Sequence, residues 1–404
     1  MKIRSITYFV NPGYPINHKE IQRGGRFINA AREAYSSSGL NVQTSRLATV
    51  PFPELLPGMI QEKSVSFAQE LEDLAQAEGF DYVSIGSAIP SLPESYKIIP
   101  EILGETEKVF ASGIIATKEN GISLPAIREC AEIIREISTI DPKGFGNLYF
   151  AALANVPAGV PFFPAAYHSG ERPAFALAIE AADLAVQALS GVTGIAEASA
   201  RLVEAIEINA QKMTRISKAL ERKAGIRFLG IDFSLAPYPE SESSLGTAME
   251  ALGVPAVGLH GSLMAAAFLT GAIDKAKFLK AGFNGLMLPL LEDATLAKRA
   301  YEGTLSVKDL LMYSAVCGTG LDTVPLPGAT TPKQIEAVLL DLSVLALRLD
   351  KPLTARLMPI PGKMAGDTTD FNFSYFANTR VLGLSAEPLQ GLLQSDESIR
   401  IEKR

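Results

Sequence analysis

The chain has 404 residues, of which 47% are hydrophobic and 20% charged, and these values are typical of a folded protein and exclude a disordered one. Its net charge of −7 and the lack of a clustered basic face argue against nucleic-acid binding, which needs Lys and Arg to neutralise phosphates. Two cysteines, Cys130 and Cys317, cannot staple a chain of this length, so we expect a reducing cytoplasm. We expect neither a signal peptide nor a membrane span, because Asn11-Pro12-Gly13 ends the first apolar run early and no long uncharged stretch follows.

Short apolar runs rich in β-branched residues alternate with stretches of helical period. In the first half, strands are predicted at residues 3–10, 40–47, 81–85, 146–152 and 175–179, with helices at 19–37, 64–77, 123–137 and 195–223. In the second half, strands are predicted at 227–232, 285–289, 321–326 and 354–360, with helices at 243–252, 262–273, 292–301, 307–315 and 332–349. This alternation predicts an α/β protein with parallel strands and helical crossovers.

The strand count is compatible with a closed barrel of about ten strands wrapped by helices. The pattern offers no clean linker, so we expect one domain over residues 1–404. The Pro- and Gly-rich stretch 156–170 is interpreted as a loop of the functional site.

Two of the three histidines occupy unusual contexts. His168 ends a rigid apolar stretch, and His260 lies in a Gly-His-Gly bend where the backbone must turn. Because the ordinary pKa of histidine lies near neutral pH, the pair could act as general acid and base. Each could instead satisfy backbone groups in its loop, and His18 has the pattern of a surface residue.

Asp232 and Ser234 end a predicted strand, where ligand sites gather in parallel α/β folds. Asp322 follows a Gly-rich loop and could orient a histidine or hold a metal. Cys317 precedes the same loop and could be a nucleophile or a packed side chain. Asp232 could equally serve as a turn residue.

Arg356 lies within an apolar strand and therefore needs a partner, either a bound anion or an internal carboxylate. Lys118 and Asn120, in an Asn-Gly turn, are further candidates for ligand binding. Ser262, which could cap a helix, completes the predicted binding set with Ser234. No metal motif occurs, so a metal or cofactor is not specified.

These loops resemble a known family of unassigned function, domain of unknown function 711, also called uncharacterised protein family 0210. The resemblance rests on the stretches 232–237, 258–261 and 317–322 and on Arg356 with Pro359; residues 118–121 and 165–168 match more weakly. It implies a fold similar to the ten-stranded barrel of pyruvate formate-lyase-like enzymes, with Cys317 at the place of a radical-forming thiol. Residues 371–375 stand where the family carries a Gly-rich segment, so we expect one wall of the pocket to differ.

Three hypotheses follow. The first is an enzyme that acts on a small polar or anionic metabolite by non-radical acid–base chemistry as a lyase, isomerase or hydrolase. The second is a metabolite sensor without catalysis. The third is a radical enzyme using Cys317 and Gly383, since Arg380-Val381-Leu382-Gly383-Leu384 resembles a glycyl-radical motif. Ala-rich helices such as 195–210 could pair two subunits, so a homodimer is expected.

Overall fold

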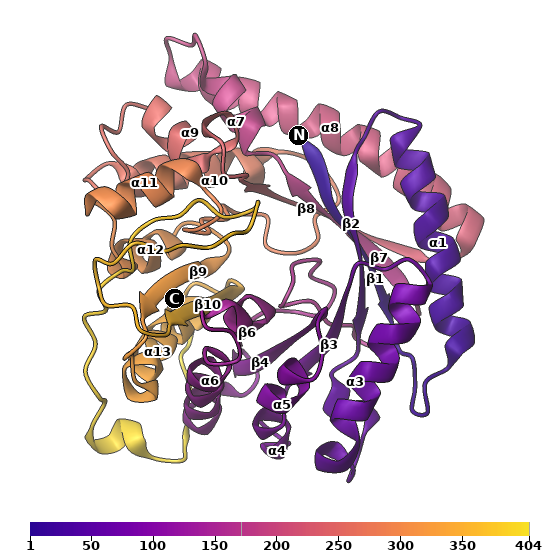
Figure 1. Ribbon diagram of the computed structural model, residues 1–404. Coiled ribbons are helices and arrows are strands. Elements are labelled where there is room, and N and C mark those ends of the chain that lie inside the picture. Colours follow the sequence, from indigo (N-terminus) through magenta and orange to yellow (C-terminus); the bar gives the residue numbers. More distant parts are fainter. Residues whose placement is uncertain (171, 404) are drawn as a thin grey trace.

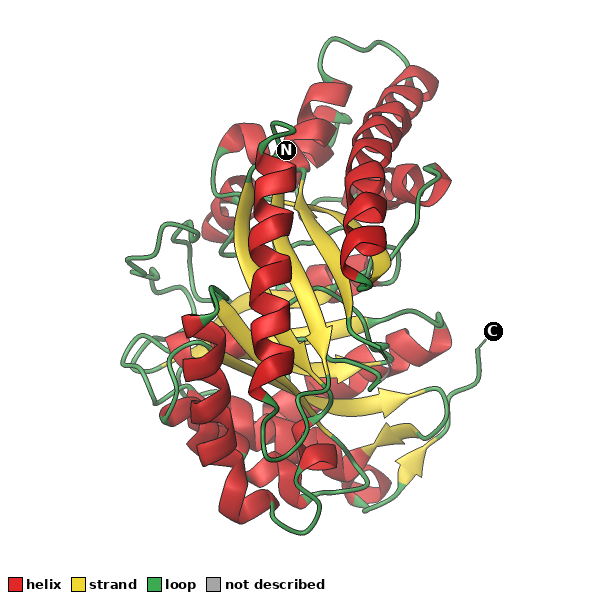
Figure 2. Cartoon of the chain, turned by 90° about the vertical axis from the view of Figure 1, so that its right-hand side faces the viewer, coloured by secondary structure: helices red, strands yellow, loops and turns green. Residues whose placement is uncertain are grey.

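The computed structural model describes residues 1–170 and 172–403 and has a mixed α/β architecture (Figure 1). Within this range one curved sheet contains eleven strands, the first starting at Lys2 and the last ending at Ile399. Helices surround the outside of the strands (Figures 1 and 2).

Five strands from the first part of the chain pair in parallel, each with the next. They are β1 (Lys2–Val10), β2 (Val42–Thr49), β3 (Tyr82–Ala88), β4 (Val109–Thr117) and β6 (Phe150–Ala154). The connecting helices are α1 (His18–Ser36), α2 (Phe52–Leu55), α3 (Ile60–Ala77), α4 (Glu94–Lys97), α5 (Ile99–Gly104), α6 (Leu124–Ile137) and the 3-10 helix η1 (Phe145–Tyr149).

Four later strands run in the opposite direction. Strand β7 (Ala174–Glu180) pairs in parallel with β8 (Arg227–Ala236), and β9 (Gly320–Pro327) pairs in parallel with β10 (Leu353–Ile360). The two groups meet through antiparallel pairs, β1 with β7 and β6 with β10. The short strands β5 (Gly121–Ser123) and β11 (Ser398–Ile399) form an antiparallel extension beside β4.

The helices of the second part lie between and beyond these strands. They are α7 (Ala182–Leu189), α8 (Ile195–Ala224), η2 (Ser241–Ser243), α9 (Leu245–Ala251), α10 (Ser262–Lys275), α11 (Ala294–Glu302), α12 (Val307–Ser314), α13 (Pro332–Arg348) and η3 (Gly391–Gln394). Among the described residues, no helix combines the length and apolarity needed to cross a membrane.

The segment 280–289 lies between the two edge strands of the sheet. Lys280 bridges in parallel to Ile231 of β8, and Pro289 bridges in parallel to Asp322 of β9. Because β8 and β9 are the ends of the strand order, this segment connects edges that would be far apart in a flat sheet. The sheet therefore curves around an interior.

The α/β prediction is confirmed, and most predicted helices and strands lie within a few residues of their expected bounds. Strand β4 was not predicted, although it is an apolar run buried along most of its length. Residues 285–289 make only isolated bridges, partly because Pro289 has no N–H to donate to a ladder. Most neighbouring strands pair in parallel, as predicted, but the β1–β7 and β6–β10 pairs are antiparallel.

Candidate functional site

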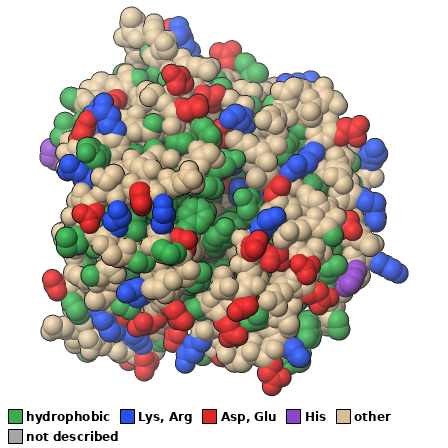
Figure 3. Space-filling model, in the orientation of Figure 1, with side chains coloured by type: hydrophobic (Ala, Val, Ile, Leu, Met, Phe, Trp, Pro, Cys, Tyr) green, Lys and Arg blue, Asp and Glu red, His purple; other side chains and the backbone are tan. Residues whose placement is uncertain are grey.

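A cavity of about 100 Å³ lies on the inner side of the curved sheet. By the measure in which one water occupies about 10–15 Å³, this volume holds a ligand of about seven to ten non-hydrogen atoms. The face seen in Figure 3 is hollowed near its middle, and hydrophobic side chains surround the hollow.

The cavity wall combines charged residues with aromatic ones. Its polar members come mainly from strands: Arg4, Gln43, Thr44, Arg46, Tyr82, Asp232, Ser234, Glu292 and Arg356. Its apolar and aromatic members include Phe110, Leu148, Phe162, Phe163, Ile179, Met287, Phe373 and Tyr375. Elements from nearly the whole length of the chain therefore meet at one site.

Strand geometry explains why several polar residues share this wall. Successive side chains of a strand point to opposite faces, so Thr44 and Arg46 of β2 face the same side, as do Asp232 and Ser234 of β8. Arg4 and Arg356 each lie at a break in register, in the β1–β7 and β10–β9 pairs respectively. Such bulges re-aim a side chain and are frequent beside functional sites.

Four charged side chains form a continuous buried chain of ion pairs. Arg4 binds one oxygen of Glu292, and Arg356 Nη2 lies 3.0 Å from the other oxygen, Oε1. Arg356 Nε also donates to Asp322 Oδ1 at 2.6 Å. Asp322 Oδ2 is buried and forms no hydrogen bond with the residues that the structure describes. We call Arg4, Glu292, Arg356 and Asp322 the ion-pair chain.

The ion-pair chain drives the pKa values of its two carboxyl groups apart. Burial alone would raise the pKa of Glu292, but attraction to Arg4 and Arg356 outweighs burial and leaves it below the ordinary value. For Asp322, burial and repulsion from Glu292 together outweigh the attraction of Arg356, so its pKa is raised. The two carboxyl groups thus share Arg356 but have pKa values shifted in opposite directions, an arrangement found at acid–base sites.

The guanidinium of Arg46 differs from its two neighbours. Its Nε donates to Thr44 Oγ1 at 3.0 Å, and its Cζ lies 5.1 Å from the ring centre of Phe163 and 6.0 Å from that of Tyr82. In the described part of the chain, no carboxylate lies within ion-pair distance of it. Burial, followed by repulsion from Arg4, lowers the pKa of Arg46 to about 10.

Backbone strain occurs beside the ion-pair chain. Thr323, next to Asp322, has a φ of 43°, in the left-handed region that β-branched residues rarely adopt. Its hydroxyl oxygen accepts a hydrogen bond from the Leu291 N–H at 3.4 Å. Strained residues of this kind concentrate at functional sites, so the strain at Thr323 supports a functional role for the neighbouring cavity.

The predicted loop 156–170 contributes to the cavity, but not through its histidine. Phe162 and Phe163 of this loop line the cavity. His168 is buried, its backbone N–H donates to the Thr49 carbonyl at 2.8 Å, and its ring centre lies 6.3 Å from that of Phe9. It is not among the cavity-lining residues.

His260 lies on the surface, in the loop before α10. The structure therefore does not bring His168 and His260 together at the cavity. Ser262, two residues on, is buried at the start of α10, where its hydroxyl donates to the Leu259 carbonyl at 2.7 Å and accepts from the Gly258 N–H at 3.1 Å. These bonds close the local turn.

Asp232 and Ser234 line the cavity, but both are extensively hydrogen-bonded. Asp232 accepts from the N–H groups of Ser234, Phe283 and Asn284 and from the Ser234 hydroxyl. The Ser234 hydroxyl oxygen accepts from the Gly285 N–H at 3.2 Å. Burial nonetheless raises the pKa of Asp232. Together these residues attach the segment 280–289 to β8.

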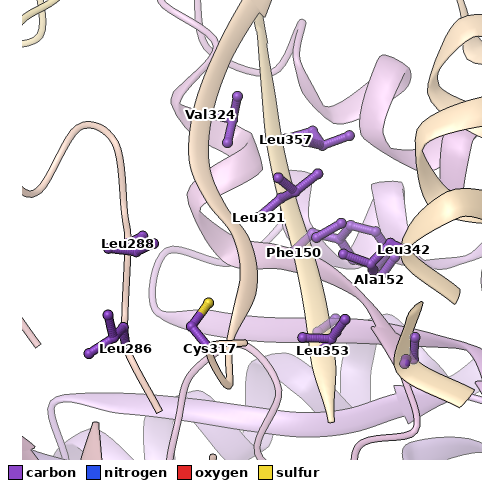
Figure 4. Close-up of a cluster of buried hydrophobic side chains, with 14 of the residues drawn as sticks. Phe150, Ala152, Leu286, Leu288, Cys317, Leu321, Val324, Leu342, Leu353 and Leu357 are labelled. Atoms are coloured by element: carbon purple, nitrogen blue, oxygen red, sulfur yellow. The ribbon is translucent and has the colours of Figure 1, made fainter. Parts of the chain in front are cut away.

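Cys317 is fully buried among aliphatic side chains, including Leu286, Leu288, Leu321 and Leu353 (Figure 4). Burial raises the pKa of its thiol, and it does not line the cavity. Gly383 is exposed in the C-terminal segment. Cys130 is also buried, and both cysteines are unpaired.

Lys118 and Asn120 lie on the surface in the turn between β4 and β5. Lys118 pairs with Asp350, and the Asn120 N–H donates to Thr117 Oγ1 at 3.1 Å. Neither lines the cavity. Within residues 1–170 and 172–403, no three His, Cys, Asp or Glu side chains are grouped as ligands for a metal ion.

Arg4, Arg46, Tyr82 and Glu292 line the cavity but were not predicted from the sequence. Arg4, inside the mainly apolar strand 3–10, carried the signal that identified Arg356, whereas Arg46 follows three polar residues and did not carry it. Glu292 ends the apolar run 286–291, so it carried a similar signal.

The fold and the cavity together define an α/β protein with an arginine-rich, aromatic-lined pocket inside its sheet. Residues 1–374 match the family described as Uncharacterised ACR (DUF711), and the chain belongs to that family, as the sequence motifs indicated. A UPF0210 protein of Pyrobaculum arsenaticum is 34% identical over 377 residues, covering 87% of this chain and 80% of the relative. UPF0210 proteins of Clostridium botulinum and Oenococcus oeni are 30% and 29% identical, covering 85% and 88% of this chain and 80% and 82% of the relatives.

Proposed function

We propose that this protein is an enzyme that binds a small anionic metabolite in the cavity and acts on it by non-radical acid–base chemistry. The observation that carries the proposal is Arg46, a partly buried guanidinium at the cavity wall without a carboxylate partner among the described residues. An isolated charge is costly to bury, and a bound anion would supply the missing partner.

The acid–base groups of the proposal are Glu292 and Asp322. Glu292 lines the cavity and can reach a ligand, whereas neither His168 nor His260 lines it. Glu292 is the proposed proton acceptor for the bound molecule, and Arg356, which contacts both carboxyl groups, couples it to Asp322, whose pKa burial raises. Lyase and isomerase reactions, which move a proton beside an anionic group, suit this arrangement.

The runner-up function is a sensor that binds the same anion without transforming it. The Asp322–Glu292 pair favours catalysis over sensing, because binding alone needs no pair of carboxyl groups with opposite pKa shifts. Radical chemistry receives less support, since Cys317 packs among aliphatic side chains and does not reach the cavity wall.

We also propose that the curved sheet is a barrel of the pyruvate formate-lyase type and that residues 1–404 form one domain. Two observations support a barrel: the antiparallel arrangement of two parallel groups, and the segment 280–289 bridged to both edge strands. A cytoplasmic homodimer remains part of the same proposal, with the exposed Ile195 and Ile208 of α8 as candidate contacts.

The test combines binding and turnover. Melting temperatures are measured with a panel of small carboxylates and phosphate esters for the wild type, for Arg46→Met, and for Arg201→Met as a control that removes an exposed arginine of α8. A native-state ligand raises the melting temperature, so anions should stabilise the wild type and the control but not Arg46→Met.

Compounds that bind are then incubated with each protein and followed by mass spectrometry. Consumption by the wild type and the control, lost in Arg46→Met, supports the enzyme. Binding without consumption supports the sensor. Stabilisation that is equal in Arg46→Met and the wild type overturns the proposal.

A further inference from the structure

The cavity wall has two chemically different parts, and their arrangement restricts what the site accepts. Arg4 and Arg356 are both engaged by carboxylates of the ion-pair chain, so Arg46 is the guanidinium of the cavity that remains for a ligand. Asp232 does not need a cationic group on the ligand, because its carboxyl group already accepts four hydrogen bonds. Three come from backbone N–H groups and one from the Ser234 hydroxyl. One cation is thus available for one negative charge.

The shape of the Arg46 site favours a carboxylate. Thr44 occupies Nε, which leaves the two terminal nitrogens as a fork that matches two oxygens in a plane. A doubly charged phosphate would bring a second charge into the same cavity as the carboxylate of Glu292. That charge would be repelled at short range in a poorly solvated space.

The remaining wall is aromatic and suits a flat apolar body. Phe163 packs edge-on against Phe110, with ring centres 5.3 Å apart and an interplanar angle of 62°. From the C-terminal segment, Phe373 and Tyr375 line the cavity, and their rings lie 5.3 Å apart. Aromatic rings favour offset or edge-on contact with a further ring.

We propose that the ligand is a small aromatic monocarboxylic acid, whose carboxylate binds Arg46 and whose ring packs between Phe163, Phe373 and Tyr375. This inference rests on the proposed function, because it assigns a chemical class to the same cavity. The volume of about 100 Å³ limits the acid to a single ring with small substituents.

The test uses 2-aminobenzoate, a fluorescent acid of this size, with 2-aminobenzamide as its neutral, isosteric control. The chain contains no tryptophan, so probe emission is free of tryptophan background. We expect saturable binding of the acid, at least tenfold weaker binding of the amide, and at least tenfold loss of acid affinity in Arg46→Met. Arg201→Met should bind as the wild type does.

A second variant tests the aromatic wall. Phe373→Leu should weaken 2-aminobenzoate several-fold while leaving the binding of acetate, measured by competition, unchanged. Equal affinities for the acid and the amide overturn the inference, as does a Phe373→Leu variant that weakens both acids alike.

Inorganic phosphate and phenyl phosphate separate this inference from the proposed function. If they bind in an Arg46-dependent manner and 2-aminobenzoate does not, the anion site stands and the carboxylate assignment fails. If no anion in the set binds in an Arg46-dependent manner, both fail.

Discussion

The arginine residues at the cavity affect the free energy of unfolding in opposite directions, depending on whether each has a carboxylate partner. Arg356 compensates Glu292 and Asp322, whereas Arg46 has no carboxylate partner in the described chain. Removing one member of a buried pair leaves an uncompensated charge and costs about 3–5 kcal/mol. Removing an isolated, partly buried charge such as that of Arg46 relieves part of its desolvation cost.

We therefore predict that Arg356→Met lowers the free energy of unfolding by about 3–5 kcal/mol, while Arg46→Met raises that of the ligand-free protein by about 1 kcal/mol. Methionine retains the apolar stem in both variants. Urea denaturation at neutral pH measures both values. A loss of stability in Arg46→Met comparable to that in Arg356→Met would show that Arg46 has a structural partner.

The opposite pKa shifts of Glu292 and Asp322 predict opposite dependences of stability on pH. The pKa of Glu292 is lower in the folded protein, because attraction to Arg4 and Arg356 outweighs burial. Its stabilisation is therefore present above the unfolded pKa of about 4.3 and is lost as the pH falls through the folded value. Glu292→Gln should be least stable, relative to the wild type, near neutral pH, and the difference should shrink in acid.

For Asp322 the sign reverses, since burial raises its pKa in the folded protein. The favourable contribution of the protonated form is present below about 3.9 and is lost as the pH rises through the folded value. Asp322→Asn imitates the protonated form, so the stability of this variant relative to the wild type should increase as the pH rises. The free energy of unfolding of both variants, measured across the acid pH range, tests the two predictions. If the two variants show the same dependence on pH, the opposite pKa shifts of Glu292 and Asp322 are contradicted.

At the level of elements, one carboxylate holds the starts of two helices. Asp293 precedes α11 and accepts from the N–H groups of Thr295 and Leu296 at 3.0 and 2.9 Å. It also accepts from the Leu245 N–H of α9 at 2.6 Å and from the Ser244 hydroxyl at 2.6 Å. Because Asp293 follows Glu292 directly, it also fixes where the cavity carboxylate emerges.

We predict that Asp293→Ala lowers the free energy of unfolding by about 3 kcal/mol, since several buried donors lose their acceptor. Ser306→Ala, which removes the exposed cap of α12, is the matched control and should cost about 1 kcal/mol. Urea denaturation measures both. Equal losses of stability in the two variants would show that the link between α9 and α11 contributes nothing to the free energy of unfolding.

For the whole molecule, the segment 280–289, which bridges the edge strands β8 and β9, depends on a close approach of two backbones. A Cβ atom at Gly285 would lie 2.2 Å from the nitrogen of Gly318, in the loop between α12 and β9. Only glycine at position 285 therefore allows the two backbones to approach this closely. Backbone atoms cannot yield as a flexible side chain can. The contact therefore fixes the segment that bridges β8 and β9.

Gly285→Ala should consequently lower the free energy of unfolding by about 3 kcal/mol and loosen the cavity wall at Met287 and Glu292. Gly271→Ala in α10 is the control, because a Cβ there meets no atom within 4 Å, and it should stabilise by up to about 1 kcal/mol. Hydrogen exchange of residues 280–292 reports the loosening. Unchanged exchange would indicate that the close contact does not hold the segment 280–289 in place.

The sequence alone determined the alternation of strands and helices, the family, and the need of Arg356 for a charged partner, because these follow from local periodicity, motifs and the cost of a buried charge. It did not determine which polar residues share a cavity. His168 and His260 look alike in sequence, yet one is buried beside Phe9 and the other is exposed.

Only the tertiary structure placed Arg4, Arg46, Glu292 and Arg356 around one space, since they come from four separate segments of the chain. The physical reason is register. A shift of one residue turns a strand side chain to the opposite face, and Arg4 and Arg356 lie at breaks in the β1–β7 and β10–β9 pairs, which form only when the sheet assembles.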